Sequence, residues 1–200
     1  MIYRLQKAEG AAALRRAAPL FDGWQETAVW SALQQEMGCI WTLSDTPRAA
    51  LCENADFLFL AGSAQEAETE QLLRAWQQER AGRFVILVPR EPSCGPLIEQ
   101  IFGADAQAET RFAFHKGGEC FDLCTLRQLT EKRPADVQLK SFDRELYAVS
   151  LQSEWSRDFV SQFRNADDYL RRGIGVAALR GKELVGGASS YTVYRGGIEV

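Results

Sequence analysis

The sequence predicts an α/β protein with two regions, each built of helices and strands packed in layers. Apolar residues recur at helical spacing in several stretches, and short apolar runs of strand length alternate with them. Glycine and proline stand between many of these stretches, where turns and helix ends are expected. A chain of 200 residues with 46% hydrophobic and 25% charged residues is long enough for one large core or two small ones. Together these features are typical of a layered α/β architecture.

Residues 1–135 are predicted to form the first domain. The expected order is two helices, three strands, a helix, a strand, a helix and a strand. In that order the residues are 8–18, 27–37, 39–43, 48–52, 56–61, a helix from a capping box at 63–66 to Gly82, 84–88, 97–102 and 111–116. The run FVILV at 84–88 predicts a strand that is buried on both faces.

Residues 136–200 are predicted to form a second domain, after a connecting helix over 121–131 and a boundary at 132–135. The expected order is strand, helix, helix and three strands. The three strands lie in residues 173–200, and the third stops while apolar and polar residues still alternate. We therefore expect this domain to be cut off before its end.

Charge and cysteine content exclude several classes of protein. A net charge of −4 and a pI near 5.2 do not favour a nucleic-acid groove or binding to an anionic membrane. No apolar run approaches the roughly 20 residues of a membrane helix, and the N-terminus lacks the apolar core of a signal peptide. Five cysteines in apolar surroundings indicate reduced thiols. We expect a cytoplasmic protein.

Four sequence blocks together resemble a known family. They are EWSRD at 154–158, DDYLRRG at 167–173, GASSYTVY at 187–194 and GGIEV at 196–200. These blocks, in this order, resemble the GNAT acetyltransferase family that includes the zwittermicin A resistance acetyltransferase. Earlier pieces, among them FLFLAG at 57–62 and RFAF at 111–114, also stand in the order that the family shows. The resemblance therefore covers nearly the whole chain, and it is more specific than the order of helices and strands.

The resemblance implies a bacterial, acetyl-CoA-dependent N-acetyltransferase with a GNAT domain that begins near Val137. The implied acceptor is an amine of a small molecule, with an aminated antibiotic as one candidate. In the family, the strand that begins at Ile198 continues into a Gln/Arg-x-x-Gly-x-Gly/Ala loop that holds the pyrophosphate at a helix N-terminus. This loop, and the tyrosine that often protonates the leaving thiolate, would lie after Val200. The 200 residues alone are therefore expected to be inactive.

Acetyl transfer to an amine requires a base, donors for the oxyanion and a leaving thiolate. Glu199 is the candidate base, because it is the one carboxylate on the strand that borders the acetyl group in GNAT folds. A solvent-facing strand residue is the alternative interpretation. The backbone of Ile198 and Val200 is expected near the pantetheine arm of the cofactor.

Four further residues are candidates for binding the acceptor. Ser189 and Tyr191 lie two residues apart on one predicted strand and should share a face, which is either the cleft or a polar surface stripe. Trp155 and Glu154 fall between the first two helices of the GNAT domain, a segment that walls the acceptor site in these folds. An exposed Trp155 would suit an amine, and a buried one would be part of the core.

Two other patterns carry no site. Residues 172–177, RGIGVA, match the pyrophosphate pattern, but they leave a helix and enter a strand, whereas phosphate binds where a loop enters a helix. His115, Cys120 and Cys124 lack the spacing and the fourth ligand of a zinc site, so no metal is expected.

A second hypothesis belongs to another class of function. The front region repeats the GNAT-like order of elements without a glycine-rich phosphate loop. It is therefore interpreted as a degenerate acyltransferase half that serves as a binding or dimerisation module. A homodimer is left open on this hypothesis, and the chain could then be a non-catalytic interaction protein.

Overall fold

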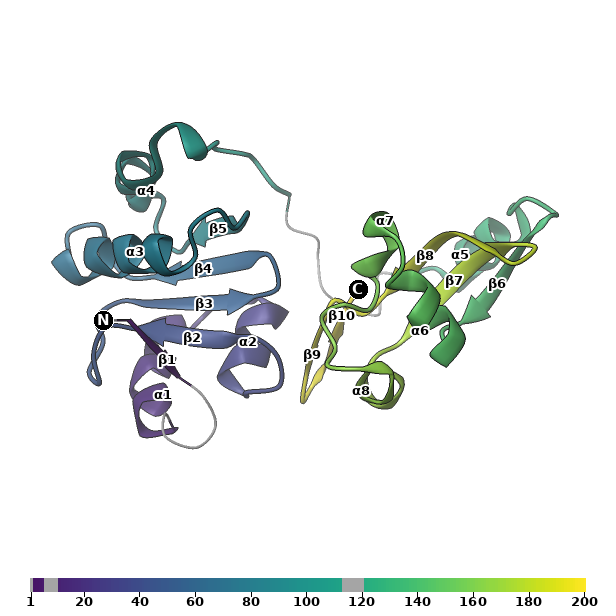
Figure 1. Cartoon of the computed structure of the whole chain (residues 1–200), viewed down its shortest axis with the longest axis horizontal. Coiled ribbons are helices and arrows are strands. Elements are labelled where there is room, and N and C mark those ends of the chain that lie inside the picture. Colours follow the sequence, from purple (N-terminus) through teal and green to yellow (C-terminus); the bar gives the residue numbers. More distant parts are fainter. Residues whose placement is uncertain (1, 6–10, 113–120) are drawn as a thin grey trace. The chain divides into compact units, whose positions relative to one another are not determined.

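The computed structural model of the protein describes residues 2–5, 11–112 and 121–200. The chain divides into two compact units, which are Met1–Ala106 with Ser190–Val200 (unit 1) and Gln107–Ser189 (unit 2). Both units mix helices and strands, so the predicted α/β class is confirmed (Figure 1). The units divide the chain after Ala106 and after Ser189. The domain boundary near residue 135 stays a prediction.

Unit 1 contains a mixed sheet and the helices on its two faces. The strands of the mixed sheet are β1 (Tyr3–Leu5), β2 (Cys39–Thr42), β3 (Ala50–Asn54), β4 (Phe57–Ala61) and β5 (Ile86–Pro89). Two more strands of unit 1, β9 (Thr192–Tyr194) and β10 (Gly197–Glu199), pair only with each other among the described residues. Its helices are α1 (Ala11–Ala17), η1 (Ala18–Phe21), α2 (Thr27–Leu33), α3 (Ala67–Glu79), η2 (Pro92–Cys94), α4 (Gly95–Phe102) and η3 (Gly103–Asp105).

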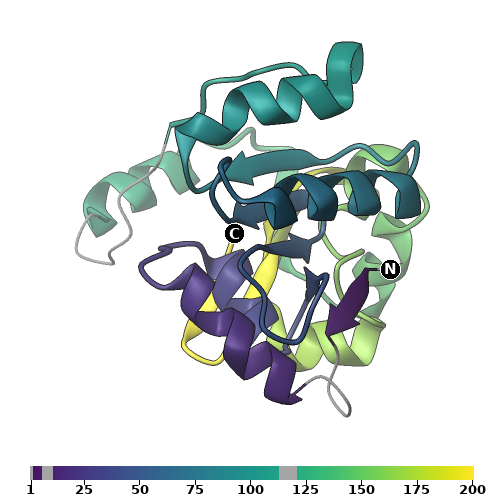
Figure 2. The same cartoon turned by 90° about the vertical axis from the view of Figure 1, so that its left-hand side faces the viewer.

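Strands β1 to β5 form one sheet in sequence order, with a parallel pair β4–β5 after antiparallel pairs. Helices α1 and α2 cover one face, and α3 and α4 cover the other (Figures 1 and 2). The FLFLA run of β4 shows why a strand can be apolar at every position. Phe59 packs in the core under α1 and α2, whereas Leu58 and Leu60 pack in the core under α3.

Unit 2 contains a smaller antiparallel sheet in the order β6–β7–β8. Its elements are α5 (Leu123–Glu131), β6 (Val137–Ser141), α6 (Arg144–Ser150), α7 (Glu154–Arg157), α8 (Ala166–Arg172), β7 (Gly175–Arg180) and β8 (Glu183–Ser189). Asp143 and Asn165 cap α6 and α8 by accepting hydrogen bonds from the backbone N–H three residues later, as the sequence predicts.

Tyr169 of α8 is the centre of an aromatic cluster in unit 2. Its ring lies 4.9 Å from that of Phe163, 5.7 Å from that of Phe142 and 5.8 Å from that of Tyr147, measured between centroids. Tyr169 is itself almost fully buried. This cluster supplies much of the apolar core that a three-stranded sheet needs on one face.

Several predicted elements differ from the structure. The prediction of a capping box at 63–66 is wrong. Glu66 is the N-cap of α3, and the Ser63 hydroxyl donates a hydrogen bond to the Gln65 side chain. Strand β5 is only half-buried, and Phe84 lies outside it with 76% of its surface exposed. Strand β1 was not predicted. The strand predicted over 111–116 falls mostly outside the described residues, and 111–112 are in no strand.

The strand predicted to run through Tyr191 is interrupted. Strand β8 ends at Ser189, Tyr191 lies in a bend, and β9 begins at Thr192. The expectation that Ser189 and Tyr191 share one face of a continuous strand is therefore wrong. Alternation along a strand fixes the direction of side chains only while the strand is unbroken.

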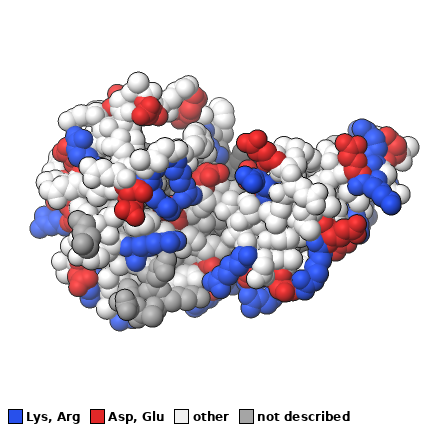
Figure 3. All heavy atoms as spheres, viewed as in Figure 1, with Lys and Arg blue, Asp and Glu red and all other residues white. Residues whose placement is uncertain are grey.

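Charges of both signs occur on the face that the space-filling view in Figure 3 shows. On the face shown in Figure 3, acidic and basic side chains are interspersed in each unit. Among the described residues, no helix is both long and apolar enough to cross a bilayer.

Candidate functional site

The candidate base Glu199 lies on a two-stranded ribbon formed by β9 and β10. Glu199 is the cross-strand partner of Thr192, and Ile198 is that of Val193. The Thr192 hydroxyl donates a hydrogen bond to Glu199 Oε2 over 3.1 Å, and the Tyr191 N–H donates to the Glu199 carbonyl oxygen over 2.7 Å. Thr192 is fully buried and Glu199 is half-buried. Tyr191 therefore holds the backbone of Glu199, and Thr192 of β9 holds its carboxylate.

The edge of β10 that faces away from β9 presents backbone N–H and C=O groups. In an antiparallel pair, residues alternately direct their N–H and C=O groups toward the partner strand and away from it. Both backbone groups of Val193 are bonded on the side away from β10, so its partner Ile198 directs its own groups to the free edge of β10. In the part of the chain that the structure describes, no strand pairs with this edge. Ile198 and Val200 are both exposed.

The ribbon is held against α2 and the turn that follows it. The Ser31 hydroxyl donates to the Val193 carbonyl oxygen over 2.5 Å, and the Val193 N–H donates to the Met37 sulfur over 3.3 Å. Gln34 Oε1 accepts from the Arg195 N–H over 2.6 Å. Figure 1 shows β9 next to α2, and the two elements are in contact.

Tyr191 contacts the turn between β3 and β4. Its hydroxyl accepts a hydrogen bond from the Asp56 N–H over 3.3 Å, and its ring packs edge-on against Phe57 with 6.0 Å between centroids. These contacts place the side chain of Tyr191 against the central sheet of unit 1. Its predicted contact with the acceptor stays a prediction.

Ser189 forms hydrogen bonds within unit 2. Its hydroxyl lies 2.6 Å from the Phe159 carbonyl oxygen, to which it donates, and 2.8 Å from the Tyr169 hydroxyl. Burial raises the pKa of Tyr169, and the bond to Ser189 opposes this rise. A Cβ at Gly175 would lie 2.3 Å from the Tyr169 hydroxyl, so this junction depends on the absence of a side chain there. Substrate binding by Ser189 stays a prediction.

Trp155 and Glu154 are exposed on the short helix α7. Trp155 has 53% of its surface exposed, and its ring packs edge-on against Phe159 with 5.8 Å between centroids. The alternative interpretation of Trp155 as a core residue is wrong. An exposed indole beside a carboxylate is chemically suited to a cationic amine, through cation–π and charge interactions.

The described cysteines are free, and burial makes three of them poor nucleophiles. Desolvation raises the pKa of Cys39 and Cys94, and it raises that of the fully buried Cys52 well above its ordinary value. Among the described residues, no group of three or more His, Cys, Asp and Glu side chains is arranged to hold a metal ion. His115 and Cys120 lie outside the described residues.

Comparisons with known proteins agree with this architecture. The family model described as GNAT acetyltransferase matches residues 18–200. The chain belongs to the GNAT acetyltransferase family. A solved structure of a GCN5-related N-acetyltransferase-like protein from Streptococcus suis 89/1591 superposes with a TM-score of 0.83 at 36% identity, over 94% of this chain and 74% of that one. No curated protein sequence matches.

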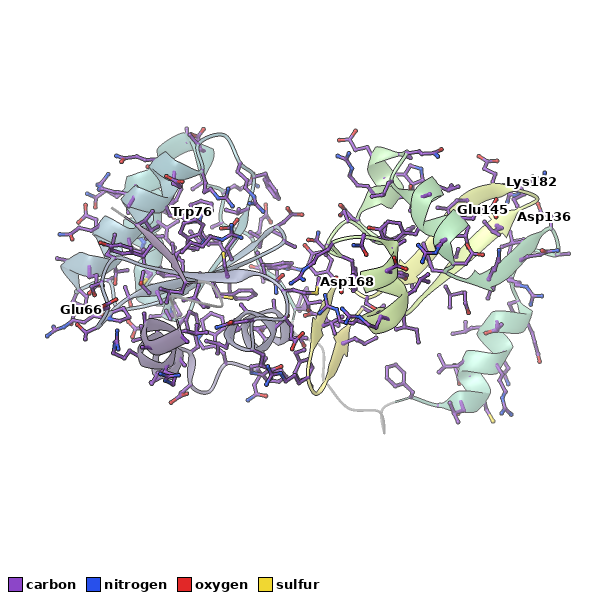
Figure 4. The ribbon with its side chains drawn as sticks, turned by 60° about the horizontal axis from the view of Figure 1, so that its bottom comes forward. Glu66, Trp76, Asp136, Glu145, Asp168 and Lys182 are labelled. Atoms are coloured by element: carbon purple, nitrogen blue, oxygen red, sulfur yellow. The ribbon has the colours of Figure 1, made fainter. Side chains whose placement is uncertain are left out.

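The N-terminus of α3 is not suited to bind phosphate. Glu66, Glu68 and Glu70 lie at or within its first turn, where their charge opposes an anion. Glu68 also accepts hydrogen bonds from the Ser44 hydroxyl and the Arg48 N–H. Figure 4 places Glu66 at the outer surface, at the beginning of the helix.

The parallel strands β4 and β5 stay paired and do not separate. They stay in register from Phe57 opposite Ile86 to Leu60 opposite Pro89. Arg90, the next residue, donates its N–H to the Leu60 carbonyl oxygen and its guanidinium to the carbonyl oxygens of Leu20 and Asp22. A depression of about 240 Å³ beside Arg90 is lined by Gly23, Trp24, Val88 and Pro89. Arg90 therefore ties the connection before α2 to the end of β5.

Sequence reasoning missed Ser31 and Met37 as residues of this region. Ser31 is fully buried on a helix whose other buried residues are mostly apolar. A hydroxyl among alanine and valine residues was a usable signal, because a buried polar group needs a partner. The identity of that partner, 162 residues away, was not readable from helical spacing.

Proposed function

We propose that the protein is an N-acetyltransferase that moves an acetyl group from acetyl-CoA to an amine of a small molecule. The observation that carries the proposal is the family match over residues 18–200. The structural likeness to a GCN5-related N-acetyltransferase-like protein supports it. We further propose that the protein acts in the bacterial cytoplasm and that an aminated antibiotic is one acceptor to test.

Glu199 is proposed to accept the proton that the amine must lose. A lysine-like amine has a pKa of roughly 10 in water, so it is protonated at neutral pH and cannot attack a thioester in that form. Glu199 fits this role because the residue is half-buried and its carboxylate is fixed by Thr192 through one oxygen, Oε2. Among the described residues, no side chain or backbone donor binds Oε1. That oxygen is proposed to receive the proton, directly or through water.

The backbone at the free edge of β10 is proposed to bind the acyl donor. Acetyl-CoA supplies the activated acetyl group, and its pantetheine arm carries amides that need hydrogen-bond partners. The outward N–H and C=O groups of Ile198 fit such an arm, because an exposed strand edge binds extended amide chains. The exposed backbone of Val200, directly after β10, is proposed to extend this binding edge. On unit 2, Trp155 and Glu154 are proposed to attract the cationic acceptor.

A non-catalytic role is proposed for the α/β part of unit 1 before residue 107. Two observations favour it, namely the in-register pairing of β4 with β5 and the acidic first turn of α3. A cofactor arm cannot enter between paired strands, and a pyrophosphate is repelled by carboxylates at a helix N-terminus. This part of the chain then serves binding or assembly, with a homodimer as one form to test.

Calorimetry and a thiol-release assay test the proposed reaction on the complete natural protein, together with any residues that follow Val200. This complete protein is called the full-length protein below. We expect acetyl-CoA to bind with micromolar-class affinity and CoA to be released when a panel of small amines, including aminated antibiotics, is added. The variant E199Q should bind acetyl-CoA and lose most acetyl transfer. The variant E183Q removes an exposed carboxylate from another strand and should leave the rate unchanged. Absence of acetyl-CoA binding by the wild-type protein would refute the proposal.

A further inference from the structure

We infer that Ser31 and Met37 are positioning residues for Glu199. They are proposed to hold the ribbon that carries the base in the orientation needed for acetyl transfer. This inference rests on the proposed function. It gives the N-terminal part of the chain a non-catalytic task, the positioning of the base, in addition to the binding or assembly proposed above.

Ser31 and Met37 together satisfy both backbone groups of one residue. Val193 sits in the middle of β9 and is buried, and its N–H and C=O groups point away from β10. Without partners these groups would be an orphaned strand edge, which is costly when buried. The Ser31 hydroxyl and the Met37 sulfur occupy the places that a neighbouring strand would otherwise fill.

The bond from Ser31 is unusual for a serine inside a helix. Such a hydroxyl commonly bonds a carbonyl oxygen of the preceding turn of its own helix. Here it reaches across to Val193 over 2.5 Å, and Ser31 has no exposed surface. Neighbouring contacts reinforce this docking, because the Trp30 ring lies 5.3 Å from that of Tyr194 and Arg195 pairs with Glu36. The ribbon is therefore bound along β9 and at its turn.

The position of Glu199 follows from that of β9. Glu199 is opposite Thr192, which holds Oε2 of its carboxylate, and its carbonyl oxygen is held by Tyr191. Thr192 is the residue directly before Val193. A shift of Val193 relative to α2 therefore moves Thr192, whose hydroxyl holds the carboxylate. A misplacement of about 1 Å at a reacting group can cost about 10²-fold in rate.

The test combines the variants S31A and M37L with E199Q in the full-length protein. S31A removes the donor to Val193, and M37L keeps the volume of the side chain but removes the sulfur acceptor. The matched control is T42V, which removes another fully buried hydroxyl of unit 1, one that has no hydrogen-bond partner among the described residues. Two quantities are measured, the exchange rate of the Val193 amide by NMR and the kcat and KM of acetyl transfer.

We expect S31A and M37L to raise the exchange rate of the Val193 amide at least tenfold, and T42V to leave it unchanged. In S31A, kcat should fall about tenfold while KM for the amine stays within twofold, because a loss confined to the transition state lowers kcat and kcat/KM together. In the E199Q background, S31A should have no further effect, because Ser31 acts through Glu199.

Three results would overturn the inference. The first is unchanged Val193 exchange in S31A and M37L, and the second is faster exchange with an unchanged kcat. The third is a loss of kcat from S31A that is equally large in the wild-type and E199Q backgrounds, which would indicate general destabilisation. The exchange measurement does not need activity. A failure of the wild-type protein to transfer acetyl groups would therefore refute the proposed function and is distinguishable from loss of the ribbon contacts.

Discussion

The variant D168N should destabilise unit 2 by about 2 kcal/mol at neutral pH. Asp168 of α8 has 6% of its side chain exposed and accepts hydrogen bonds from the side chains of Arg172 and Arg171 and from the Arg164 N–H (Figure 4). The Arg172 guanidinium is the largest cause that lowers the pKa of Asp168, from 3.8 to about 2. A difference of this size corresponds to about 2 kcal/mol in favour of the charged form in the folded state.

This contribution should depend on pH in a defined direction. Because the folded-state pKa is lowered, the stabilisation is fully present above the unfolded-state value near 3.8 and is lost as the pH falls toward about 2. The gap in the free energy of unfolding between wild type and D168N should therefore be about 2 kcal/mol at pH 7 and close near pH 2. The variant D167N removes the neighbouring, exposed carboxylate, which pairs with Arg144, and should cost less than about 0.5 kcal/mol.

The assay is a urea titration followed by amide NMR signals of α8, at several pH values from 7 to 2. Residue-resolved signals are needed because a chain with two compact units does not have to unfold in one step. A gap below about 0.5 kcal/mol at pH 7 would refute the reasoning. So would a gap that stays constant down to pH 2, because the effect would then not come from the charge of Asp168.

Two further variants test the cores of the two units. E53Q should cost about 3 kcal/mol in thermal unfolding, because the Glu53 carboxylate is 5% exposed and balances two arginine side chains, whereas E70Q at a surface ion pair should change little. G175A should cost about 1 to 3 kcal/mol, because its Cβ would collide with Tyr169, whereas G186A, with 3.8 Å to its nearest neighbour, should be tolerated. Equal melting temperatures within either pair of variants would contradict these expectations.

The local pattern of the chain was sufficient for most helices and strands. Asp143 and Asn165 cap the helices that the sequence predicts, and FLFLA forms a buried strand. These features depend on neighbours within a few residues, so the sequence contains the information. The capping box at 63–66 fails because Ser63 and Gln65 bond to each other, and this competing local bond was not readable from the residue types.

The family, the α/β class and the candidate residues followed from the sequence alone, because residue blocks and hydrophobic periods are local properties. Only the tertiary structure decided where those residues lie. Strand β8 ends at Ser189 and does not include Tyr191, and Trp155 is exposed. Strand β9, which pairs with the strand of Glu199, is hydrogen-bonded to Ser31. The physical reason is that a hydrogen bond between residues 162 apart leaves no period in the sequence, although the buried groups it satisfies must be paired.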